Sequence, residues 1–332
     1  MLKQLQTIAR ALPKNSQVPS LDGFCIDGNT VIASNLDFTI IAELDRDYGE
    51  CVADKKLLET LKRMPDADIQ IDDVITFKSK SSKVKLNKIS EVEEYPTVDD
   101  VTEWPSFEVD ADLLKDAISK TAPFASTEQE KVTFMGVYWQ GDNMTASDTF
   151  RLATVSLGVD TDIDVLIPAK YLLELARIIE GKVKVYHNDK KVAFKWDGYT
   201  AILSLISGKY PDLTQILSQK PETLVTVNKE EFREGAERTT VVMDAFQTIK
   251  IEGSDKLYLK TEGESGQAEA EVEAEIRGSQ FEVYFNINFI LQPLKLIEGD
   301  EAELGISGPQ GAFRLEQDGF KYLALPVKRE AD

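Results

Sequence analysis

The sequence predicts an α+β chain made of three copies of one unit, and three observations lead to this prediction. The chain has 332 residues, which is enough for two or three domains of ordinary size. Similar segments return at a spacing near 115 residues, as Leu57 and Leu172 do. Each copy combines two amphipathic helical segments with short alternating strands, a pattern typical of helices packed on antiparallel sheet.

The repeat rests on several segments that keep the same order and spacing. The range 52–64 resembles 167–179 and 285–297, and the range 31–40 resembles 144–153. Tyr95-Pro96 returns as Tyr210-Pro211. Because these segments agree with one another, we expect three domains that span residues 1–104, 105–221 and 222–332.

Each unit is expected to begin with a helix, continue with hairpins and add a second helix before its last strands. In the first unit Leu2, Leu5, Ile8 and Leu12 recur at helical spacing, and Gly28-Asn29 marks a hairpin turn. Units two and three open with a strand, whereas the first helix begins at Met1. Either the first unit lacks that strand or the true start lies upstream. The six helical ranges are 2–14, 54–63, 112–120, 170–180, 229–238 and 287–297.

The charge is distributed unevenly along the chain. Acidic residues outnumber basic ones by 58 to 38, and the net charge of −20 taken alone argues against a nucleic-acid binder. The six helical ranges nevertheless contain fifteen basic and ten acidic residues. If the helices share one face, they form a positive lining inside an acidic shell; the alternative is that these side chains are simply solvated. The candidate lining residues are Lys3, Arg10, Lys14, Lys55, Lys62, Arg63, Lys115, Lys120, Arg177, Arg233 and Lys295.

The residue inventory argues against an enzyme. His187 is the only histidine, and we expect it in an exposed hairpin turn. Asp72-Asp73 and Asp99-Asp100 are conceivable acid–base pairs, but adjacent strand residues point to opposite faces. No nucleotide-binding or zinc-binding motif is present. We therefore expect no catalytic residue, no cofactor and no metal.

The sequence also predicts a cytoplasmic protein without membrane contact. Its two cysteines, Cys25 and Cys51, cannot form a disulfide framework, which fits a reducing compartment. No apolar run approaches the length of a membrane span, and the first residues lack a signal-peptide core.

Four segments carry a resemblance to a known family: ASDTFRLA (146–153), LISGKYPDLTQIL (205–217), FNINFILQPLKLIEGDEAELGISGP (285–309) and YLALPVK (322–328). They resemble segments of the bacterial sliding clamp, the DNA polymerase III beta subunit family. The resemblance runs over nearly the whole chain in the family's order. It implies a head-to-tail ring of two chains, with six clamp-type domains around double-stranded DNA and helices lining the hole. It also implies a polymerase processivity factor, loaded by a separate ATPase.

The resemblance further implies a pocket between units two and three for short peptides of DNA polymerase and clamp-loader subunits. Its wall would be formed by Phe134, Gly136, Ser147, Thr149, Phe150, Arg151, Leu152, Pro211, Gln215, Ile216, Leu323, Leu325, Pro326, Val327 and Lys328. Without the resemblance, these apolar residues would be read as ordinary core.

For ring closure, the resemblance implies that edge strands of the first and third domains pair between chains. The corresponding residues are Val84 and Leu86 against Val241 and Val242, with nearby lysines facing an acidic third domain.

The sequence departs from the family at the pocket. Thr149 and Phe150 replace a usual Gly and His, Gln215 replaces a usual Arg, and Val327-Lys328 replaces Met-Arg. The departures and the missing strand leave an alternative open, in which the chain is a phage- or mobile-element-type paralogue with altered partner specificity.

Overall fold

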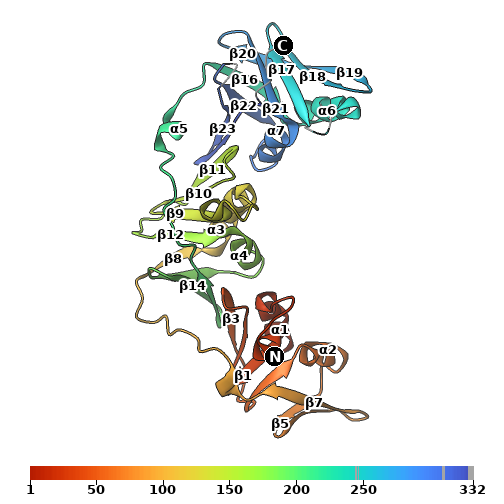
Figure 1. The fold of residues 1–332 in the computed structure, drawn as a ribbon, viewed down its shortest axis with the longest axis vertical. Helices are drawn as coiled ribbons and strands as arrows, with labels where there is room; N and C mark the ends of the chain where they lie inside the picture. The colour runs from red at the N-terminus through yellow and green to blue at the C-terminus, as the bar shows by residue number, and fades with distance from the viewer. Residues whose placement is uncertain (244, 246, 309–310, 328–332) are drawn as a thin grey trace. The chain divides into compact units, whose positions relative to one another are not determined.

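The computed structural model describes residues 1–243, 245, 247–308 and 311–327, and their contacts divide the chain into two compact units. Unit 1 contains Met1–Asp116 and Thr161–Ser207, and unit 2 contains Ala117–Asp160 and Gly208–Asp332 (Figure 1). The middle repeat of the sequence thus contributes to both units, because sheets continue from one repeat into the next. The division into three domains stays a prediction.

Unit 1 is built on one antiparallel sheet of eleven strands, in the order β5-β6-β7-β4-β1-β2-β3-β15-β14-β13-β8. The strands of unit 1 are β1 (Gly23–Asp27), β2 (Thr30–Ser34), β3 (Phe38–Glu43), β4 (Glu50–Asp54), β5 (Asp68–Ile71), β6 (Val74–Lys78), β7 (Lys83–Ser90), β8 (Ser106–Asp110), β12 (Asp164–Pro168), β13 (Lys182–His187), β14 (Lys191–Trp196) and β15 (Tyr199–Ser204). Its helices are α1 (Leu2–Ile8), α2 (Lys56–Arg63) and α4 (Ala169–Leu175), with short 3₁₀ turns at Ala9–Ala11, Pro19–Asp22 and Val92–Glu94. Helix α3 (Ala111–Thr121) runs from unit 1 into unit 2.

Unit 2 has a larger sheet that runs β9-β10-β11-β24-β23-β22-β16-β20 and a four-stranded sheet β19-β18-β17-β21. The strands are β9 (Gly136–Gln140), β10 (Asn143–Ser147), β11 (Arg151–Ser156), β16 (Thr223–Asn228), β17 (Thr248–Gly253), β18 (Leu257–Gly263), β19 (Gly266–Val272), β20 (Ala274–Arg277), β21 (Phe281–Asn286), β22 (Glu301–Ile306), β23 (Phe313–Gln317) and β24 (Phe320–Ala324). Its helices are α5 (Thr214–Ser218), α6 (Lys229–Thr239) and α7 (Ile287–Leu294), with 3₁₀ turns at Ala122–Phe124, Val132–Met135 and Thr240–Val242.

The helices form where apolar residues recur three or four positions apart. Helix α1 buries Leu5 and Ile8, and α2 buries Leu57 and Leu61, so each presents one apolar stripe to the core. The two helices lie side by side in unit 1 (Figure 1). Each of the six predicted helical ranges contains a helix, and the predicted α+β class is confirmed.

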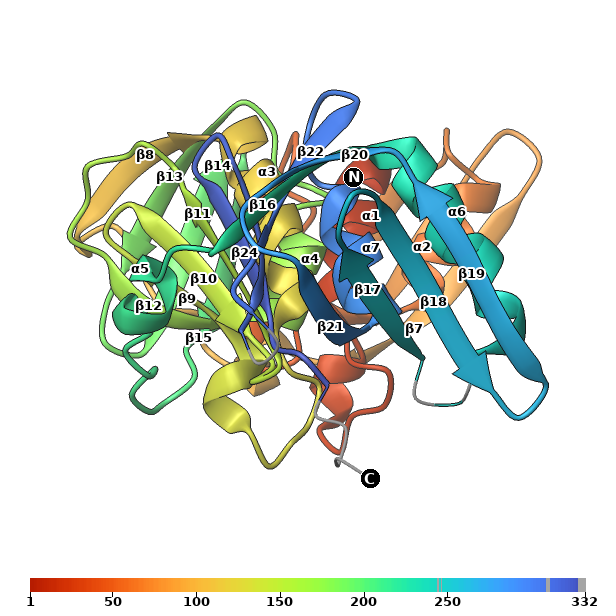
Figure 2. The same cartoon turned by 90° about the horizontal axis from the view of Figure 1, so that it is seen from above.

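Helix α6 lies against β18 and β19 in unit 2 (Figure 2). It begins at Asn228, whose side chain accepts the backbone N–H groups of Glu230 and Glu231, both at 3.0 Å. A Cβ atom added to Gly235 would lie 2.9 Å from Val272, so the helix approaches β19 closely because that position is glycine.

The expected position of His187 is wrong in one respect. The hairpin turn lies at residues 188–190, but His187 is the last residue of β13 and its side chain is only 14% exposed. Its ring meets the edge of Phe107, and its Nε2 atom lies 3.7 Å from Asp162. The sequence HND (187–189) suggested a turn because Asn188 and Asp189 are typical turn residues, but the strand continues through His187.

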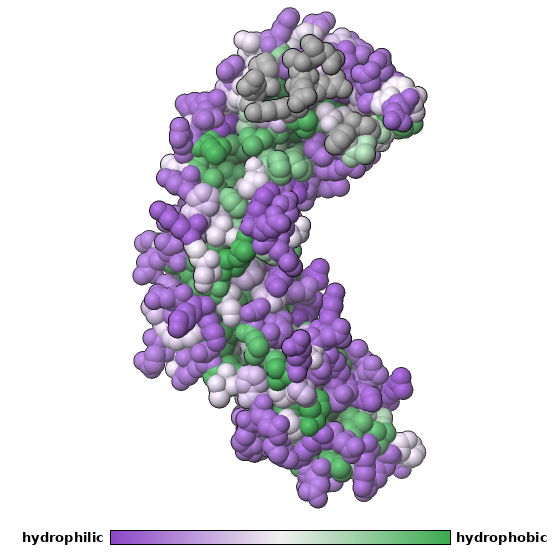
Figure 3. Space-filling model, in the orientation of Figure 1, coloured by the Kyte–Doolittle hydropathy of each residue, from purple (hydrophilic) through white to green (hydrophobic). Residues whose placement is uncertain are grey.

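The surface is largely hydrophilic on the face drawn in Figure 3, with smaller hydrophobic patches between the polar side chains. Among the helices in the described ranges, none is long and apolar enough to cross a membrane.

Candidate partner-binding surface and basic helices

A tight turn between β10 and β11 positions the first predicted pocket residues. The Ser147 hydroxyl accepts the N–H of Thr149 at 3.1 Å, and the Asp148 carboxylate accepts the N–H groups of Phe150 and Arg151 at 3.0 and 2.9 Å. These bonds hold Thr149 at a φ of 82°, a conformation that non-glycine residues rarely adopt. The turn therefore displays Phe150, which is 53% exposed.

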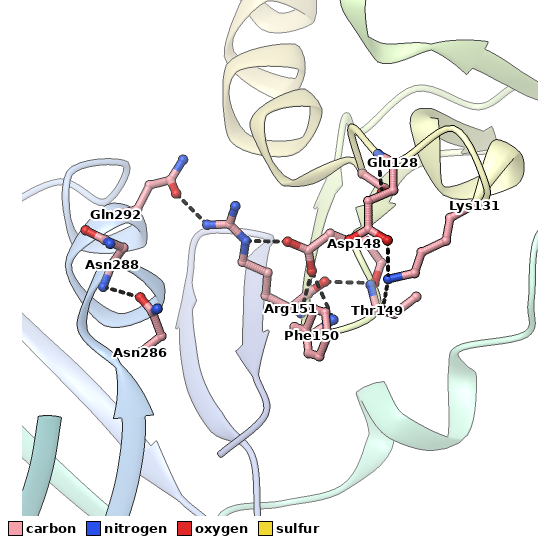
Figure 4. A network of polar contacts seen from close by, with 11 residues as sticks. Glu128, Lys131, Asp148, Thr149, Phe150, Arg151, Asn286, Asn288 and Gln292 are labelled. Carbon is pink, nitrogen blue, oxygen red and sulfur yellow. Dashed lines mark hydrogen bonds and ion pairs between the residues drawn. The ribbon is translucent and has the colours of Figure 1, made fainter. Parts of the chain in front are cut away.

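Arg151 links this turn to α7 (Figure 4). Its Nε donates to Asp148 at 2.8 Å, and its Nη1 donates to the side-chain oxygen of Gln292 at 2.5 Å. The guanidinium also lies 4.6 Å from the ring centre of Phe289 and 5.3 Å from that of Phe124. Because its side chain is only 16% exposed, we interpret Arg151 as a residue that holds the surface together.

An apolar cluster lies directly beneath the turn. Leu152 of β11 stands opposite Leu323 of β24, and both pack with Ala312. Leu213 and Leu217, from the segment around α5, cover this cluster and stay partly exposed. We call the apolar side chains of this region the Leu152 surface: Phe150, Leu152, Leu213, Ile216, Leu217, Ala312, Leu323 and Leu325.

Arg314 fastens α5 to the Leu152 surface. The guanidinium is buried and donates to the carbonyl oxygens of Ile216 at 2.5 Å and of Leu217 at 3.4 Å. Burial lowers its pKa, since the charged form loses water. The carbonyl groups at the end of a helix attract a cation, so this contact holds the short helix in place.

The rim of the Leu152 surface includes three exposed apolar side chains. Ile216 is 42% exposed and Leu325 is 47% exposed, beside the exposed ring of Phe150. The N–H of Leu325 donates to the carbonyl of Phe150 at 2.8 Å, which joins the C-terminal segment to the turn. Exposed apolar side chains gathered in this way are typical of a binding surface.

The remaining predicted pocket residues lie around this surface at different distances. Phe134 contacts the ring of Tyr210, with 5.7 Å between the ring centres, and Tyr210 directly precedes Pro211. Gly136 is buried at the start of β9, and Gln215 is exposed on α5. Pro326 and Val327 lead away from the surface, because the N–H of Val327 donates to the Tyr284 carbonyl at 2.8 Å. Lys328 lies outside the described residues.

Several residues of this region were not predicted from the sequence. Lys131 lies 5.1 Å from the Phe150 ring centre and donates to the Thr149 hydroxyl at 3.2 Å (Figure 4). Gln292 and Arg314 were not predicted either, because each forms hydrogen bonds with a residue far away in the sequence: Gln292 with Arg151, and Arg314 with Ile216. Only Arg314 had a signal, since it is a basic residue in the alternating strand pattern of 312–317.

In unit 1 the predicted lining residues are partly neutralised. Arg10 donates to Glu174 at 2.6 Å, and Arg177 donates to the same carboxylate at 2.6 Å. Lys3 lies 3.8 Å from Glu180. Lys55 donates to the Pro13 carbonyl and to Asp22. Lys14, Lys62 and Arg63 are exposed and form no ion pair with the carboxylates of the described residues.

The helices of unit 2 and α3 show the same neutralisation. Arg233 bonds to both Glu230 and Glu237, and these carboxylates raise its pKa. Lys115 on α3 lies 3.2 Å from Asp112. Lys120 is half-buried on α3, and Lys295 is exposed directly after α7. The fifteen-to-ten count therefore overstates the positive potential of the helices.

The predicted chain–chain interface stays a prediction, but its expectation that Val241 and Val242 lie on an edge strand is wrong. Val84 and Leu86 lie on a strand, β7, and are half-buried. Val241 and Val242, however, lie in the 3₁₀ turn Thr240–Val242 that follows α6, and Val241 is 83% exposed. The edge strand of this region is β19, which is the outer strand of its sheet within the described residues. The valines looked like a strand because they are β-branched.

Within the described ranges, no group of three or more His, Cys, Asp and Glu side chains is arranged to hold a metal ion.

Comparison with known proteins identifies the class of protein. The fold is that of a sliding clamp: the crystal structure of the Bacillus subtilis DNA polymerase sliding clamp matches with a TM-score of 0.90 at 23% identity, covering 99% of this chain and 97% of that chain. Family models of the DNA polymerase III beta subunit match residues 108–212, as the central domain, and residues 214–328, as the C-terminal domain.

Curated relatives agree with this class. The beta sliding clamp of Bacillus subtilis is 24% identical, over 99% of this chain and 97% of that protein. The beta sliding clamp of Staphylococcus aureus is 26% identical, over 98% and 97%. The chain belongs to the DNA polymerase III beta subunit family.

Proposed function

We propose that the chain is a non-catalytic processivity factor that closes around duplex DNA as a head-to-tail homodimer. It would tether DNA polymerase, and bind clamp-loader subunits, through the Leu152 surface. Support comes from the likeness to beta sliding clamps over nearly the full length of both chains. We infer the ring from a regular pattern of strand pairing between repeats.

The rule is that the third strand after the first helix of one repeat pairs with the last strand of the next repeat. In unit 1, β3 pairs with β15, and in unit 2, β11 pairs with β24. The third strand after α6 is β19, and the last strand of the first repeat is β7. By the same rule, β19 of one chain pairs with β7 of another, and two such contacts close a ring.

Both strands suit this contact. Residues 83–87 of β7 pair with β6 on one side, whereas β4 pairs only with Lys88 and Ser90. Lys83 and Lys85 are exposed on β7, and Glu269 and Glu271 are exposed on β19. Glu269 already pairs with Lys260 and Glu271 with Lys256, so Lys83 and Lys85 would share these carboxylates. Opposite charges on the two edges favour a head-to-tail contact over a contact between like edges.

The test of the ring is the molar mass in solution, measured by light scattering over a dilution series. We expect twice 37.1 kDa for the unmodified chain. Val241→Asp and, as a second variant, Val242→Asp should shift the mass towards the monomer, because both valines lie beside β19. Val132→Asp changes another exposed valine and should leave the dimer intact. A dimer that survives both interface substitutions would remove this contact from the proposal.

The DNA contact is proposed to be weak, salt-sensitive and independent of sequence. Lys14, Lys62 and Arg63 are the candidates with the greatest freedom to meet phosphates, since their charges are not engaged by carboxylates of the described residues. A topological link needs few phosphate contacts, so sliding remains possible. The protein should stay on nicked circular DNA after loading and leave when the circle is cut. Equal retention on linear DNA would contradict encirclement.

Peptide binding is proposed for the Leu152 surface because its rim is apolar and exposed. Leu325→Ala should weaken a peptide from the cognate polymerase by roughly 10-fold, as expected for removal of one apolar contact. Leu113→Ala, on an exposed side chain of α3, is the matched control for stability and should not alter binding. Unchanged affinity in Leu325→Ala, measured by fluorescence anisotropy, would refute this surface.

Phe150 and Lys131 favour the second candidate, a clamp with its own partner preference. Together they place an aromatic ring and an ammonium group at the rim, with 5.1 Å between them. Lys131 also forms an ion pair with Glu128 at 3.1 Å. An acidic residue next to the apolar anchor of a peptide would therefore compete with Glu128 for the ammonium group. Binding of polymerase peptides from other clamp systems with the same affinity would count against this specialisation.

A further inference from the structure

A second, smaller site lies in unit 1, at the junction of β3 with β15. It is a cavity of about 90 Å³, which has room for a few water molecules or one small side chain. We call it the Leu36 pocket. Ser34, Leu36 and Thr39 form one side, and Lys191, Ile202 and Ser204 form the other. The segment around Val98 covers it.

The Leu36 pocket and the Leu152 surface occupy the same place in two copies of the repeat. Thr39 stands opposite Ile202 between β3 and β15, as Leu152 stands opposite Leu323 between β11 and β24. The cover is equivalent too, because Val98 follows Tyr95-Pro96 as Leu213 follows Tyr210-Pro211.

The turn before each site has the same hydrogen bonds. Ser34 accepts the N–H of Leu36 at 3.1 Å, and Asn35 accepts the N–H groups of Asp37 and Phe38 at 3.2 and 2.9 Å. Leu36 has a φ of 77°, close to the 82° of Thr149 at the equivalent position. A leucine at positive φ lowers the stability of the fold, and such strain is typical of functional sites. Leu36 is also 56% exposed, so its side chain is available for contact with a ligand.

The linings differ in polarity. Thr39 replaces Leu152, Ser204 replaces Leu325 and Lys191 replaces Ala312. At the rim, Lys191 forms an ion pair with Asp99. The pocket thus offers hydroxyl groups inside, and a cation and a carboxylate at its mouth, where the equivalent surface offers aliphatic side chains.

We propose that the Leu36 pocket binds a peptide segment of a partner through one primary carboxamide side chain, asparagine or glutamine. A carboxamide has an acceptor oxygen for Lys191 and donor hydrogens for Asp99, and the Ser204 hydroxyl can donate or accept one further hydrogen bond. The Ser34 and Thr39 hydroxyls bond to each other at 2.7 Å and form a polar wall. A carboxylate would meet Asp99 with like charge, and an aliphatic side chain would form no hydrogen bond with Lys191, Asp99 or Ser204. The inference rests on the proposed function in one respect: the equivalent site is taken to bind peptides.

The experiment uses the full chain with ¹³C-labelled methyl groups of Leu, Val and Ile, and two capped tripeptides as probes. The first is acetyl-Ala-Asn-Ala-amide, and the second has Asp in place of Asn. The Asn peptide should shift the methyl signals of Leu36, Val98 and Ile202 saturably. The Asp peptide should bind at least ~10-fold more weakly, because its carboxylate would meet Asp99 with like charge and lacks the donor hydrogens of a carboxamide.

Two variants keep the proposal open to failure. Ser204→Leu copies Leu325 of the equivalent site and should abolish the shifts at Val98 and Ile202. Leu36→Gly suits the positive φ, so the fold should persist while binding weakens at least ~5-fold. The reciprocal control, Leu325→Ser, should leave binding of the Asn peptide at the Leu36 pocket unchanged.

Three outcomes would overturn the inference: equal shifts with both peptides, unchanged binding in both pocket variants, or shifts confined to Leu152, Leu323 and Leu325. None of these bears on the dimer mass or on retention by circular DNA, so the proposed function would stand or fall separately.

Discussion

The Leu36 pocket and the Leu152 surface have the same backbone and different side chains. Both sites follow a turn held by a serine hydroxyl and an Asx side chain, and both have a residue at positive φ. Yet one is lined by Thr39 and Ser204, and the other by Leu152 and Leu325. The comparison teaches that local hydrogen bonds preserve the repeated backbone, while the side chains that face a ligand are free to diverge.

The largest expected difference between the sites is in stability. Leu152→Ala should lower the free energy of unfolding of unit 2 by about 3 kcal/mol, because it empties a buried apolar site. Thr39→Ala should cost unit 1 only about 1 kcal/mol, since it removes one hydroxyl contact, the 2.7 Å hydrogen bond to Ser34. Hydrogen exchange measured by mass spectrometry across a urea series reports each unit separately. Equal losses would show that the two linings carry the same packing energy.

A smaller effect is expected at the two strained turns. Leu36→Gly and Thr149→Gly should each raise the free energy of unfolding by about 0.5 kcal/mol, because relief of the positive φ outweighs the entropy that glycine adds to the unfolded chain. Differential scanning calorimetry measures the change in Tm. The control is Leu113→Gly within α3, which should lower stability by about 1 kcal/mol. Two turns that respond with opposite signs would break the equivalence drawn between them.

The last effect concerns pH: it is absent at neutral pH and develops only in alkaline solution. Both cysteines lie in unit 1, and burial raises the pKa of Cys25 to about 12 and that of Cys51 to about 11. Above the ordinary thiol pKa the unfolded chain loses these protons, while the folded chain keeps them. The stability of unit 1 should therefore fall as the pH rises from about 9 towards 11 to 12, and it should be unaffected at lower pH.

Alkaline urea titrations of the Cys25→Ala, Cys51→Ala double variant provide the control, since its unit 1 should lose less stability over the same range. A profile identical to that of the unmodified chain would mean that other groups dominate. Burial also raises the pKa of Tyr95 in unit 1 and of Tyr210 and Tyr322 in unit 2, so both units should lose further stability above the ordinary tyrosine pKa of about 10.

The elements that sequence reasoning found are those with local causes. The helix around Leu57 and Leu61 follows from apolar spacing, and the hairpin at Gly28-Asn29 follows from its turn residues. The place of Val241 in a 3₁₀ turn was not predictable, because β-branched residues suit strands and short turns alike. The partners of Arg151 and Arg314 could not be predicted either, since Gln292 and the α5 carbonyl groups reach them only through tertiary packing.

The glutamates of β19 have a consequence for the single chain before any assembly. An outer strand with unpaired backbone groups is a template for aggregation, and charged side chains are a common protection against it. Glu269 and Glu271 are exposed on that strand and pair with Lys260 and Lys256. These charged side chains cover the edge with polar groups, which disfavours stacking against the apolar edge of another strand.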